Sequence, residues 1–315
     1  MRSIITILTN MSVSQRVGMI VLTVATAVVV AIAILSAPSG GTLERGQVES
    51  PNGSELSYLR AGDPTQQTIV LLHGLPETSD SFAPVAEAMA EDFFVIVPDL
   101  PGFGRSTLGA GVETSTDALA QELMFLLDHL EIDDVTLVVT DLGIIGLEWA
   151  RTRPNTVTHV IAYETALTPF PANGTDIGPD AIEQAIVDEN VLAERNYQAG
   201  TLRTLTDAEI QAARDSLDRK RRRLALALIA DTLANAAPYP AIFDYLASTQ
   251  TPLTVIAANP GTTLTPDQLR RLIGEQLPHA AVIDHGPGLH YLATDDPIQL
   301  ATTLRAAIDR QSLGA

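Results

Sequence analysis

Apolar positions follow two patterns along the chain, and the two patterns alternate. Short runs made almost wholly of apolar and β-branched residues are typical of strands buried on both faces of a parallel sheet. Such runs cover residues 68–73, 93–99, 134–141, 157–164, 252–259 and 280–286. Stretches with helical spacing of their apolar residues separate several of these runs, most clearly at 116–131. This alternation predicts an α/β fold with a mostly parallel sheet covered by helices on both faces.

Two segments depart from this alternation. Residues 46–50 and 54–62, separated by Pro51-Asn52-Gly53, predict an antiparallel hairpin at the start of the sheet. Residues 165–247 carry helical patterns only, and we expect these helices at 179–195, 206–234 and 240–248. An all-helical insertion after a strand is expected to form a cap over the carboxyl edge of the sheet, where open α/β sheets bind ligands.

The N-terminal region has a different composition. Residues 17–35 carry no charge and are numerous enough to span a bilayer. Arg2 and Arg16 precede this stretch, whereas Glu44 is the first charge after it. The positive-inside rule then predicts a membrane anchor with the body of the protein outside the cytoplasm. A cleaved signal peptide, followed by secretion, is the alternative.

These patterns divide the chain into six parts. We expect a cytoplasmic N-terminus at 1–16, a transmembrane anchor or signal at 17–35, a tether at 36–46, the two parts of the α/β core at 47–164 and 248–315, and the helical cap at 165–247.

Charge and cysteine content exclude several classes of function. The chain has 38 acidic and 19 basic residues and a formal net charge of −19, which argues against binding nucleic acid or anionic lipid through the folded body. The basic run at 219–223 is interpreted as a solvated helix face. There is no cysteine, so disulfides, thiolate metal ligands and a cysteine nucleophile are excluded. No histidines have the spacing of a metal site, and we expect neither a metal nor a cofactor.

An isolated carboxylate, Asp141, lies where a strand-like run meets a helix-like one, in Val139-Thr140-Asp141-Leu142-Gly143. A sharp strand-to-helix turn raises one side chain above the sheet, and the start of the helix stabilises negative charge there. This is the position of the nucleophile in G-x-S-x-G turns, although Asp replaces Ser and Val replaces the first Gly. The alternative is that Asp141 only caps the helix expected at 143–152.

Two further loops carry chemistry at the ends of predicted strands. His73-Gly74-Leu75 follows the first buried strand, where a loop of this type supplies one amide of an oxyanion hole. The other amide is expected from Leu142. His290 lies after the last strand and before the final helix, where a general base is expected, with His285 as the alternative base. The chain order places the nucleophile before the histidine.

These stretches resemble the α/β-hydrolase superfamily, and within it the haloalkane dehalogenases and epoxide hydrolases that use an Asp nucleophile. HGLPE at 73–77 is similar to the HGFPE of epoxide hydrolases, while GPGLHYLATDDP at 286–297 and VIAYETALTPFP at 160–171 resemble dehalogenase segments. The resemblance implies an α/β-hydrolase fold with a triad of Asp141, Glu164 and His290. Glu164 takes the role of the acid, and the absence of a carboxylate directly after the strand at 252–259 agrees with this.

The implied chemistry explains the residue types. A carboxylate can attack an sp³ carbon and form an alkyl ester, which water activated by His290 then cleaves at the carbonyl carbon of Asp141. Glu164 would orient the imidazole, and the amides of Leu75 and Leu142 would stabilise the oxyanion. A serine would form an ether that water cannot cleave. The expected partners are a small apolar electrophile and water, with membrane contact through the N-terminal helix alone.

The sequence departs from the dehalogenase pattern at the leaving group. Dehalogenases hold the halide with an Asn after the HG pair and a Trp after the nucleophile, and here these positions are Leu75 and Leu142. Epoxide hydrolases instead need phenol donors from the cap, for which Tyr197, Tyr239 and Tyr245 are the candidates. Haloalkane dehalogenase-like hydrolysis is therefore the first hypothesis and epoxide hydrolysis the second. A non-catalytic ligand-binding protein on a hydrolase fold is the alternative of another class.

Overall fold

The computed structural model describes residues 42–165, 167, 191–218, 221, 224, 240–262 and 264–314. One sheet of eight strands organises this part of the chain, in the order β1-β2-β4-β3-β5-β6-β7-β8. The strands are β1 (Glu44–Glu49), β2 (Glu55–Ala61), β3 (Thr68–Leu72), β4 (Phe94–Pro98), β5 (Val135–Thr140), β6 (Val157–Tyr163), β7 (Leu253–Pro260) and β8 (Ala281–Gly288). β1 and β2 pair antiparallel, as do β2 and β4, and the other pairs are parallel.

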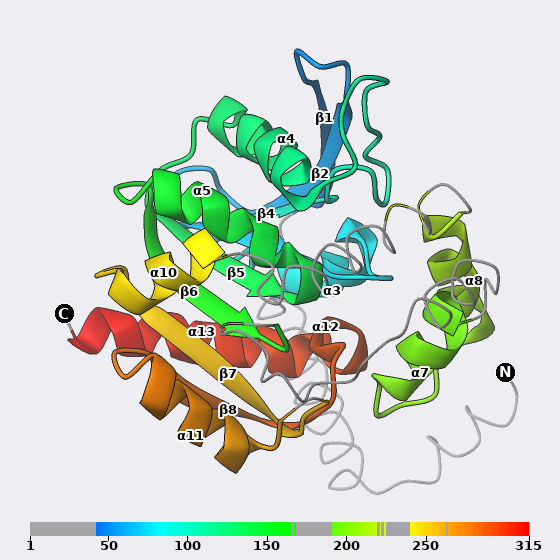
Figure 1. Cartoon of the computed structure of the whole chain (residues 1–315). Helices are drawn as coiled ribbons and strands as arrows, with labels where there is room; N and C mark the ends of the chain where they lie inside the picture. The colour runs from blue at the N-terminus through cyan, green and yellow to red at the C-terminus, as the bar shows by residue number, and fades with distance from the viewer. Residues whose placement is uncertain are drawn as a thin grey trace, which may run out of the picture. The chain divides into compact units, whose positions relative to one another are not determined.

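Helices cover both faces of the sheet (Figure 1). Those of the core are α3 (Ala83–Met89), α4 (Thr116–His129), α5 (Leu147–Thr152), α10 (Pro240–Ser248), α11 (Pro266–Gln276), α12 (Leu292–Asp295) and α13 (Pro297–Gly314). Two 3₁₀ turns, η1 (Ser79–Phe82) and η2 (Asp141–Gly146), complete it. One buried cluster unites α4, α5 and α10 with one face of the sheet, and a second unites α3 and α13 with the other. Because both faces are covered, every residue of β3, β4 and β5 is buried.

The predicted α/β architecture is present, with one local difference at the end of β5. The helix expected from 143 begins two residues earlier, as the 3₁₀ turn η2, and becomes an α-helix at Leu147. Gly143 approaches β3 so closely that an added Cβ would lie 2.5 Å from the carbonyl oxygen of Leu72. This close packing accounts for a glycine at the second position after Asp141.

The transmembrane part of the predicted fold class is corrected. Among the residues that the structure describes, no helix is both long and apolar enough to cross a bilayer. The stretch at 17–35 lies outside the described residues. We therefore no longer include a membrane helix in the fold. The domain boundaries and the location outside the cytoplasm stay predictions.

Between β6 and β7 the described elements are helices. They are η3 (Val191–Asn196, a π-helical turn), α7 (Tyr197–Ala199), α8 (Asp207–Ser216) and, next to β7, α10. We call residues 191–218 the cap segment. Figure 1 shows α7 and α8 beyond the arrowheads of β5 and β6, on the side of the carboxyl edge.

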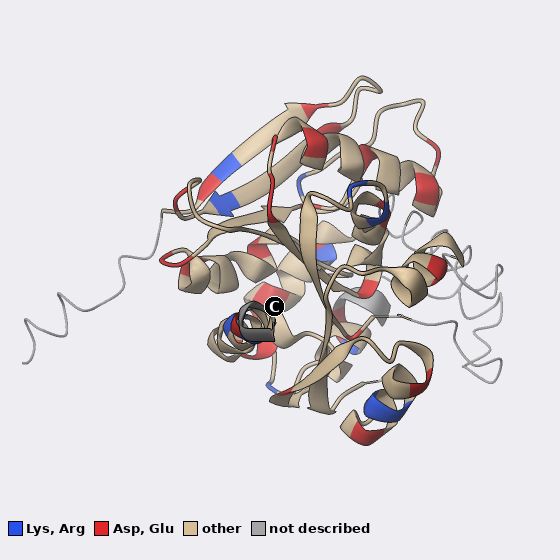
Figure 2. Cartoon of the chain, turned by 90° about the vertical axis from the view of Figure 1, so that its left-hand side faces the viewer, with Lys and Arg blue, Asp and Glu red and all other residues tan. Residues whose placement is uncertain are grey.

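Charged residues are spread over the surface and not gathered in one region. In Figure 2, where the ribbon is coloured by residue type, Asp and Glu positions are spread over helices and loops, with fewer Lys and Arg positions among them. Arg221, from the basic run, forms an ion pair with Asp218 and donates to the carbonyl oxygen of Gly104 at 3.0 Å. The other residues of that run lie outside the described part of the chain.

Candidate active site

The three residues of the expected triad follow three strands of the parallel sheet. Asp141 follows β5, Glu164 follows β6, and His290 follows β8. Carboxyl ends of parallel strands meet at one edge, so side chains far apart in the sequence come together there. Asp141 and Glu164 both have a φ of 43°, in the left-handed region that non-glycine residues rarely adopt. The two backbones are linked, because the Asp141 amide donates to the Glu164 carbonyl oxygen at 3.3 Å.

The nucleophile position contacts the HG loop directly. The backbone amide of Leu75 donates to Oδ2 of Asp141 at 2.8 Å. An added Cβ at Gly74 would lie 2.3 Å from that same oxygen, so the close approach requires glycine there. Leu142, the source of the second expected amide, is the next residue in η2, and its side chain packs against the core. The leucines at the two expected donor positions therefore bring backbone amides and no polar side chains.

The expected acid and base also lie together. His290 Nδ1 lies 3.5 Å from Glu164 Oε2, and both side chains are largely shielded from solvent. The backbone amide of Thr262 donates to the two carboxylate oxygens of Glu164 at 3.4 and 3.3 Å. Nδ1 faces the carboxylate, which leaves Nε2 as the ring nitrogen for proton transfer.

The pKa of His290 results from opposing effects. Burial alone would lower it, because the charged imidazolium loses solvation. The hydrogen bond with Glu164 and the negative charges of Asp141, Glu164 and Glu77 outweigh burial, and the pKa is raised above its ordinary value. Such an imidazole accepts a proton more readily than an isolated one, as a general base requires.

Glu77, at the end of the HGLPE segment, is a functional candidate to which the sequence analysis assigned no role. Its side chain is 3% exposed, and Thr294 Oγ1 donates to its Oε1 at 2.8 Å. Burial raises the pKa of Glu77 from 4.5 to about 7, against the effects of the Thr294 hydrogen bond and the charge of His290. The available signal was a carboxyl group in the HGLPE segment, which directly follows a predicted buried strand.

Of the three expected phenol donors, the structure describes two, and neither offers a free hydroxyl group to the triad. Tyr197 is buried in α7, and its hydroxyl group hydrogen-bonds Thr294 Oγ1 at 2.8 Å. Tyr245 OH lies 3.5 Å from Thr251 Oγ1, just before β7 begins and so at the opposite edge of the sheet from Glu164. Tyr239 lies outside the described residues.

A fourth tyrosine, which the sequence alone did not indicate, lies beside the expected triad. Tyr291 directly follows His290, and its hydroxyl group donates to the carbonyl oxygen of Leu75 at 2.9 Å. Its ring contacts those of His290 and Tyr197 edge-on, with centroids 4.6 and 4.8 Å apart. We call residues 289–291, between β8 and α12, the base loop. Tyr291 thus joins the base loop, the HG loop and the cap segment.

A family model for the alpha/beta hydrolase fold matches residues 67–297, which is most of the chain and includes the three positions of the expected triad. This protein belongs to the α/β-hydrolase family. A haloalkane dehalogenase of Mesorhizobium japonicum is 27% identical over 264 residues, which cover 77% of this chain and 84% of that protein. A soluble epoxide hydrolase of Corynebacterium is 36% identical over 99 residues, 31% of each chain.

A solved structure supports the same fold. The haloalkane dehalogenase DbeA of Bradyrhizobium elkani superposes with a TM-score of 0.72 at 24% sequence identity, covering 85% of this chain and all of that one. The resemblance to haloalkane dehalogenases expected from the sequence is therefore confirmed, and this α/β-hydrolase is an enzyme of the hydrolase class.

Two buried histidines of the hydrolase serve other contacts. His73 Nδ1 donates to the carbonyl oxygen of Gly74 at 2.8 Å, and Nε2 accepts from the Leu100 amide at 3.0 Å. Those contacts need the neutral ring, and burial lowers its pKa. His285, the alternative base, contacts Thr303 Oγ1 of α13 at 3.1 Å. No group of three or more metal-ligating side chains is arranged to hold a metal ion within the described ranges.

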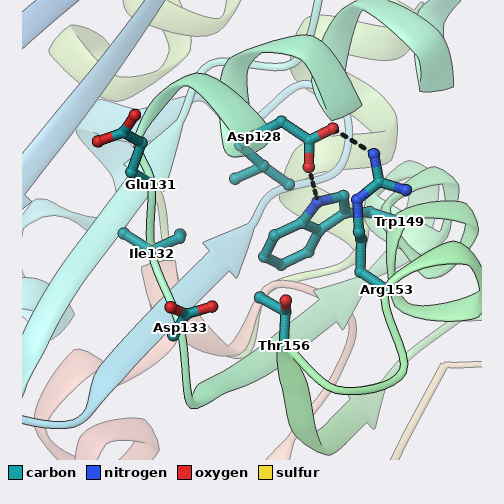
Figure 3. Close-up of a pocket in the computed structure, with 8 residues that line it drawn as sticks. Asp128, Glu131, Ile132, Asp133, Trp149, Arg153 and Thr156 are labelled. Carbon is teal, nitrogen blue, oxygen red and sulfur yellow. Dashed lines mark hydrogen bonds and ion pairs between the residues drawn. The ribbon is translucent and has the colours of Figure 1, made fainter.

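The hydrolase also has a surface cavity of about 210 Å³, at the edge of the sheet opposite Asp141 (Figure 3). It is lined by Leu127, Asp128, Glu131, Ile132, Asp133, Trp149, Arg153 and Thr156. Asp128 accepts from the indole N–H of Trp149 at 2.9 Å and from Arg153 at 2.6 Å. Trp149 therefore uses its N–H in this pocket and is not a leaving-group donor near Asp141.

Proposed function

We propose that the protein is a haloalkane dehalogenase-like hydrolase that acts on a small apolar electrophile through a covalent ester on Asp141. The observation that carries this proposal is the carboxylate of Asp141 at the elbow, with Oδ2 held by the Leu75 amide at 2.8 Å. An acid at this position forms an ester with an sp³ carbon, whereas the serine of ordinary esterases forms one with an acyl carbon.

The first step is attack of an Asp141 oxygen on carbon. The C–O bond forms as the bond to the leaving group breaks, and the leaving group departs with the electron pair. The Leu75 amide orients the carboxylate, and Asp141 directly follows β5, at the carboxyl edge of the sheet. No proton is transferred in this step if the leaving group is a halide.

The second step is hydrolysis of the ester. His290 takes a proton from water through Nε2, and the hydroxide attacks the carbonyl carbon of Asp141. The oxyanion is stabilised by backbone amides, that of Leu75 and, as expected from the sequence, that of Leu142. Glu164, 3.5 Å from His290 Nδ1, stabilises the imidazolium. Collapse of the tetrahedral intermediate breaks the bond to the alkoxide oxygen, which takes the proton of the new carboxyl group and leaves as an alcohol, so the Asp141 carboxylate is regenerated. The imidazolium of His290 then loses its proton to solvent.

Leaving-group stabilisation separates this proposal from its alternative. Leu75 and Leu142 provide no side-chain N–H for a halide, and Trp149 donates to Asp128 instead. Epoxide hydrolysis is the second candidate, favoured by the HGLPE segment and by the likeness to a soluble epoxide hydrolase. An epoxide needs a proton donor for its opening oxygen, and Tyr197 already shares its hydroxyl group with Thr294.

The test is to trap the ester in a His290→Phe variant of the full chain. Incubation with brominated alkanes and with epoxides, followed by intact-mass analysis, should give a persistent adduct, because no base activates water. The matched control is His279→Phe, which replaces a histidine in an exposed turn and should turn over without accumulating an adduct.

The mass of the adduct assigns the substrate class. An added alkyl group supports dehalogenation, while an added hydroxyalkyl group moves the assignment to epoxide hydrolysis. Absence of any adduct, together with tight binding of the same compounds, would contradict both and favour a non-catalytic binding protein.

A further inference from the structure

The cap segment contacts the loop of the expected base at its backbone. The amides of His290 and Tyr291 both donate to one acceptor, the carbonyl oxygen of Gly200, at 2.9 and 3.1 Å. Gly200 is buried, and it lies far from these residues in the sequence. Two successive amides that share one acceptor fix the direction in which the chain enters the base loop.

The contact is so close that position 200 has no room for a larger residue. An added Cβ there would lie 2.5 Å from Cε2 of Tyr291 and 3.1 Å from Cβ of His290. The φ of Gly200 is −91°, which any residue can adopt, so backbone conformation does not explain the glycine. The close approach of the base loop is the reason that position 200 requires glycine.

A second anchor joins the same two segments beside the first. Arg203 donates through Nε and Nη2 to the carbonyl oxygen of Thr294 at 3.0 and 2.8 Å. Its Nη1 donates to Glu209 Oε2 at 3.0 Å, so the guanidinium is held from both sides. Asp295 accepts from the backbone amides of Leu202 at 2.8 Å and of Arg203 at 3.3 Å.

A third anchor is a buried chain of hydroxyl groups. The Tyr197 hydroxyl group and Thr294 Oγ1 are 2.8 Å apart, and Thr294 Oγ1 in turn donates to Glu77 Oε1 at 2.8 Å. The ring of Tyr197 also packs edge-on against that of Tyr291, with 4.8 Å between the centroids. Residues 197–203 thus hold the base loop at its backbone, at its flanking helix α12 and at a neighbouring ring.

We infer that Gly200 and Arg203 are positioning residues for the base, because residues 197–203 hold the loop that keeps His290 beside Glu164. We call these residues the brace. The inference rests on the proposed function and deepens it. The brace acts on hydrolysis of the ester, which needs His290, and not on formation of the ester, which needs Asp141. The cap segment therefore helps to position the base, in addition to lying over the carboxyl edge of the sheet.

The test separates those two steps in four variants of the full chain. Gly200→Ala places a methyl group against the base loop, and Arg203→Gln removes the second anchor while leaving Gly200 in place. The matched controls are Gly274→Ala, where an added Cβ meets nothing within 4 Å, and Arg214→Gln, which removes the ion pair of another cap arginine with Glu194. Rapid quenching and intact-mass analysis, with the compound that labels His290→Phe, measure the rates at which the adduct forms and decays.

We expect both brace variants to slow adduct decay about 10-fold or more, while the rate of formation changes less than about threefold, since small displacements of a catalytic group cost this much. The controls should keep both rates. Arg203→Gln is the milder variant if Gly200→Ala does not fold. The inference would be overturned if adduct decay in the brace variants were as fast as in the wild type, or if adduct formation and decay slowed equally.

A measurement without substrate keeps the two proposals apart. NMR titration of the His290 ring reports the contact with Glu164, which raises the pKa of His290. We expect this pKa to fall in Gly200→Ala and to stay unchanged in Gly274→Ala. An unlabelled His290→Phe variant would contradict the proposed function alone, whereas an unchanged His290 pKa in both brace variants would contradict the brace alone.

Discussion

The two sides of the candidate active site differ in how many polar side chains they contain. Around the nucleophile, Leu75 and Leu142 contribute apolar side chains, and the contact with Asp141 comes from a backbone amide. Around the base, His290 has Glu164 as its partner, with Glu77 close enough to influence its pKa. The structure therefore supports proton transfer in hydrolysis more fully than it supports a departing leaving group.

That difference predicts which substrates the enzyme turns over. In the proposed mechanism, ester formation would rely on a leaving group that departs with little help, or on a donor outside the described residues. Hydrolysis of the proposed ester would use His290 as the base, Glu164 as its partner and the Leu75 amide as an oxyanion donor. Variants on each side should therefore affect different steps.

The largest effect is expected on the base side, from Glu164→Gln. Loss of the carboxylate removes the hydrogen bond and charge that raise the pKa of His290, and leaves the imidazolium without its partner. We expect adduct decay to slow by about 10²–10⁴-fold, as in other triads that lose the acid. The remaining activity should extend to lower pH, because a His290 of lower pKa stays neutral there.

Stopped-flow and quench measurements across pH would check this expectation. Glu194→Gln, which alters a glutamate of the cap segment, is the matched control. An unchanged rate of adduct decay in Glu164→Gln would show that Glu164 does not assist His290. The contrast between the two sides of the site would then be wrong.

The next effect concerns Glu77 and appears in stability. The pKa of Glu77 is raised in the folded protein, from 4.5 to about 7, so its contribution to stability is complete below pH 4.5 and lost as pH rises through 7. Over that window the fall amounts to about 3 kcal/mol, at 1.36 kcal/mol for each pKa unit. We expect Glu77→Gln to lack this fall in the free energy of unfolding. Relative to the wild type, the variant should therefore gain stability as the pH is raised from 5 to 8.

Urea unfolding of both proteins at the two pH values isolates the contribution of Glu77, because the other titrating groups are common to both. Glu87→Gln, at an exposed position of α3, is the control and should follow the wild type. An identical pH dependence in the Glu77 variant would show that this carboxyl group is already ionised at low pH.

The smallest effect is a gain on the nucleophile side. Leu75→Asn adds a side-chain donor at the position where dehalogenases hold the halide, and one hydrogen bond to a charged group contributes about 1.5–3 kcal/mol. We expect ester formation from brominated alkanes to accelerate about 10-fold, with adduct decay unchanged. Leu75→Ala is the control, since it removes the apolar side chain without adding a donor. No gain in Leu75→Asn would indicate that the leaving group departs elsewhere.

The sequence was sufficient to predict the features that depend on local order. Strand runs, the turn at Asp141 and the position of His290 all follow from patterns within a few residues, and the fold makes their ends converge. Glu164 needed the family resemblance, because a carboxylate after a strand has no local signature. The actual environment of Glu77 depends on Thr294 and Tyr197, which only the folded chain brings beside it.

The contacts of the cap segment were out of reach for the same reason. Nothing near Gly200 in the sequence indicates that its carbonyl oxygen accepts from His290. The phenol of Tyr197 was a reasonable donor on the sequence, and it is already engaged because Thr294 lies within hydrogen-bond distance. The apolar stretch at 17–35 predicted a membrane helix from hydropathy alone, a criterion that no helix of the described chain meets.

The shared carbonyl oxygen of Gly200 has a consequence for changing the substrate range of this enzyme. If a cap contacted the substrate alone, all of its residues could be varied freely to fit a new molecule. Here residues 197–203 should be kept constant while the neighbouring parts are varied, since a transplanted cap without them would lose the contacts to the loop of His290 and slow turnover. Screens for new substrates could then mistake a displaced base for poor recognition.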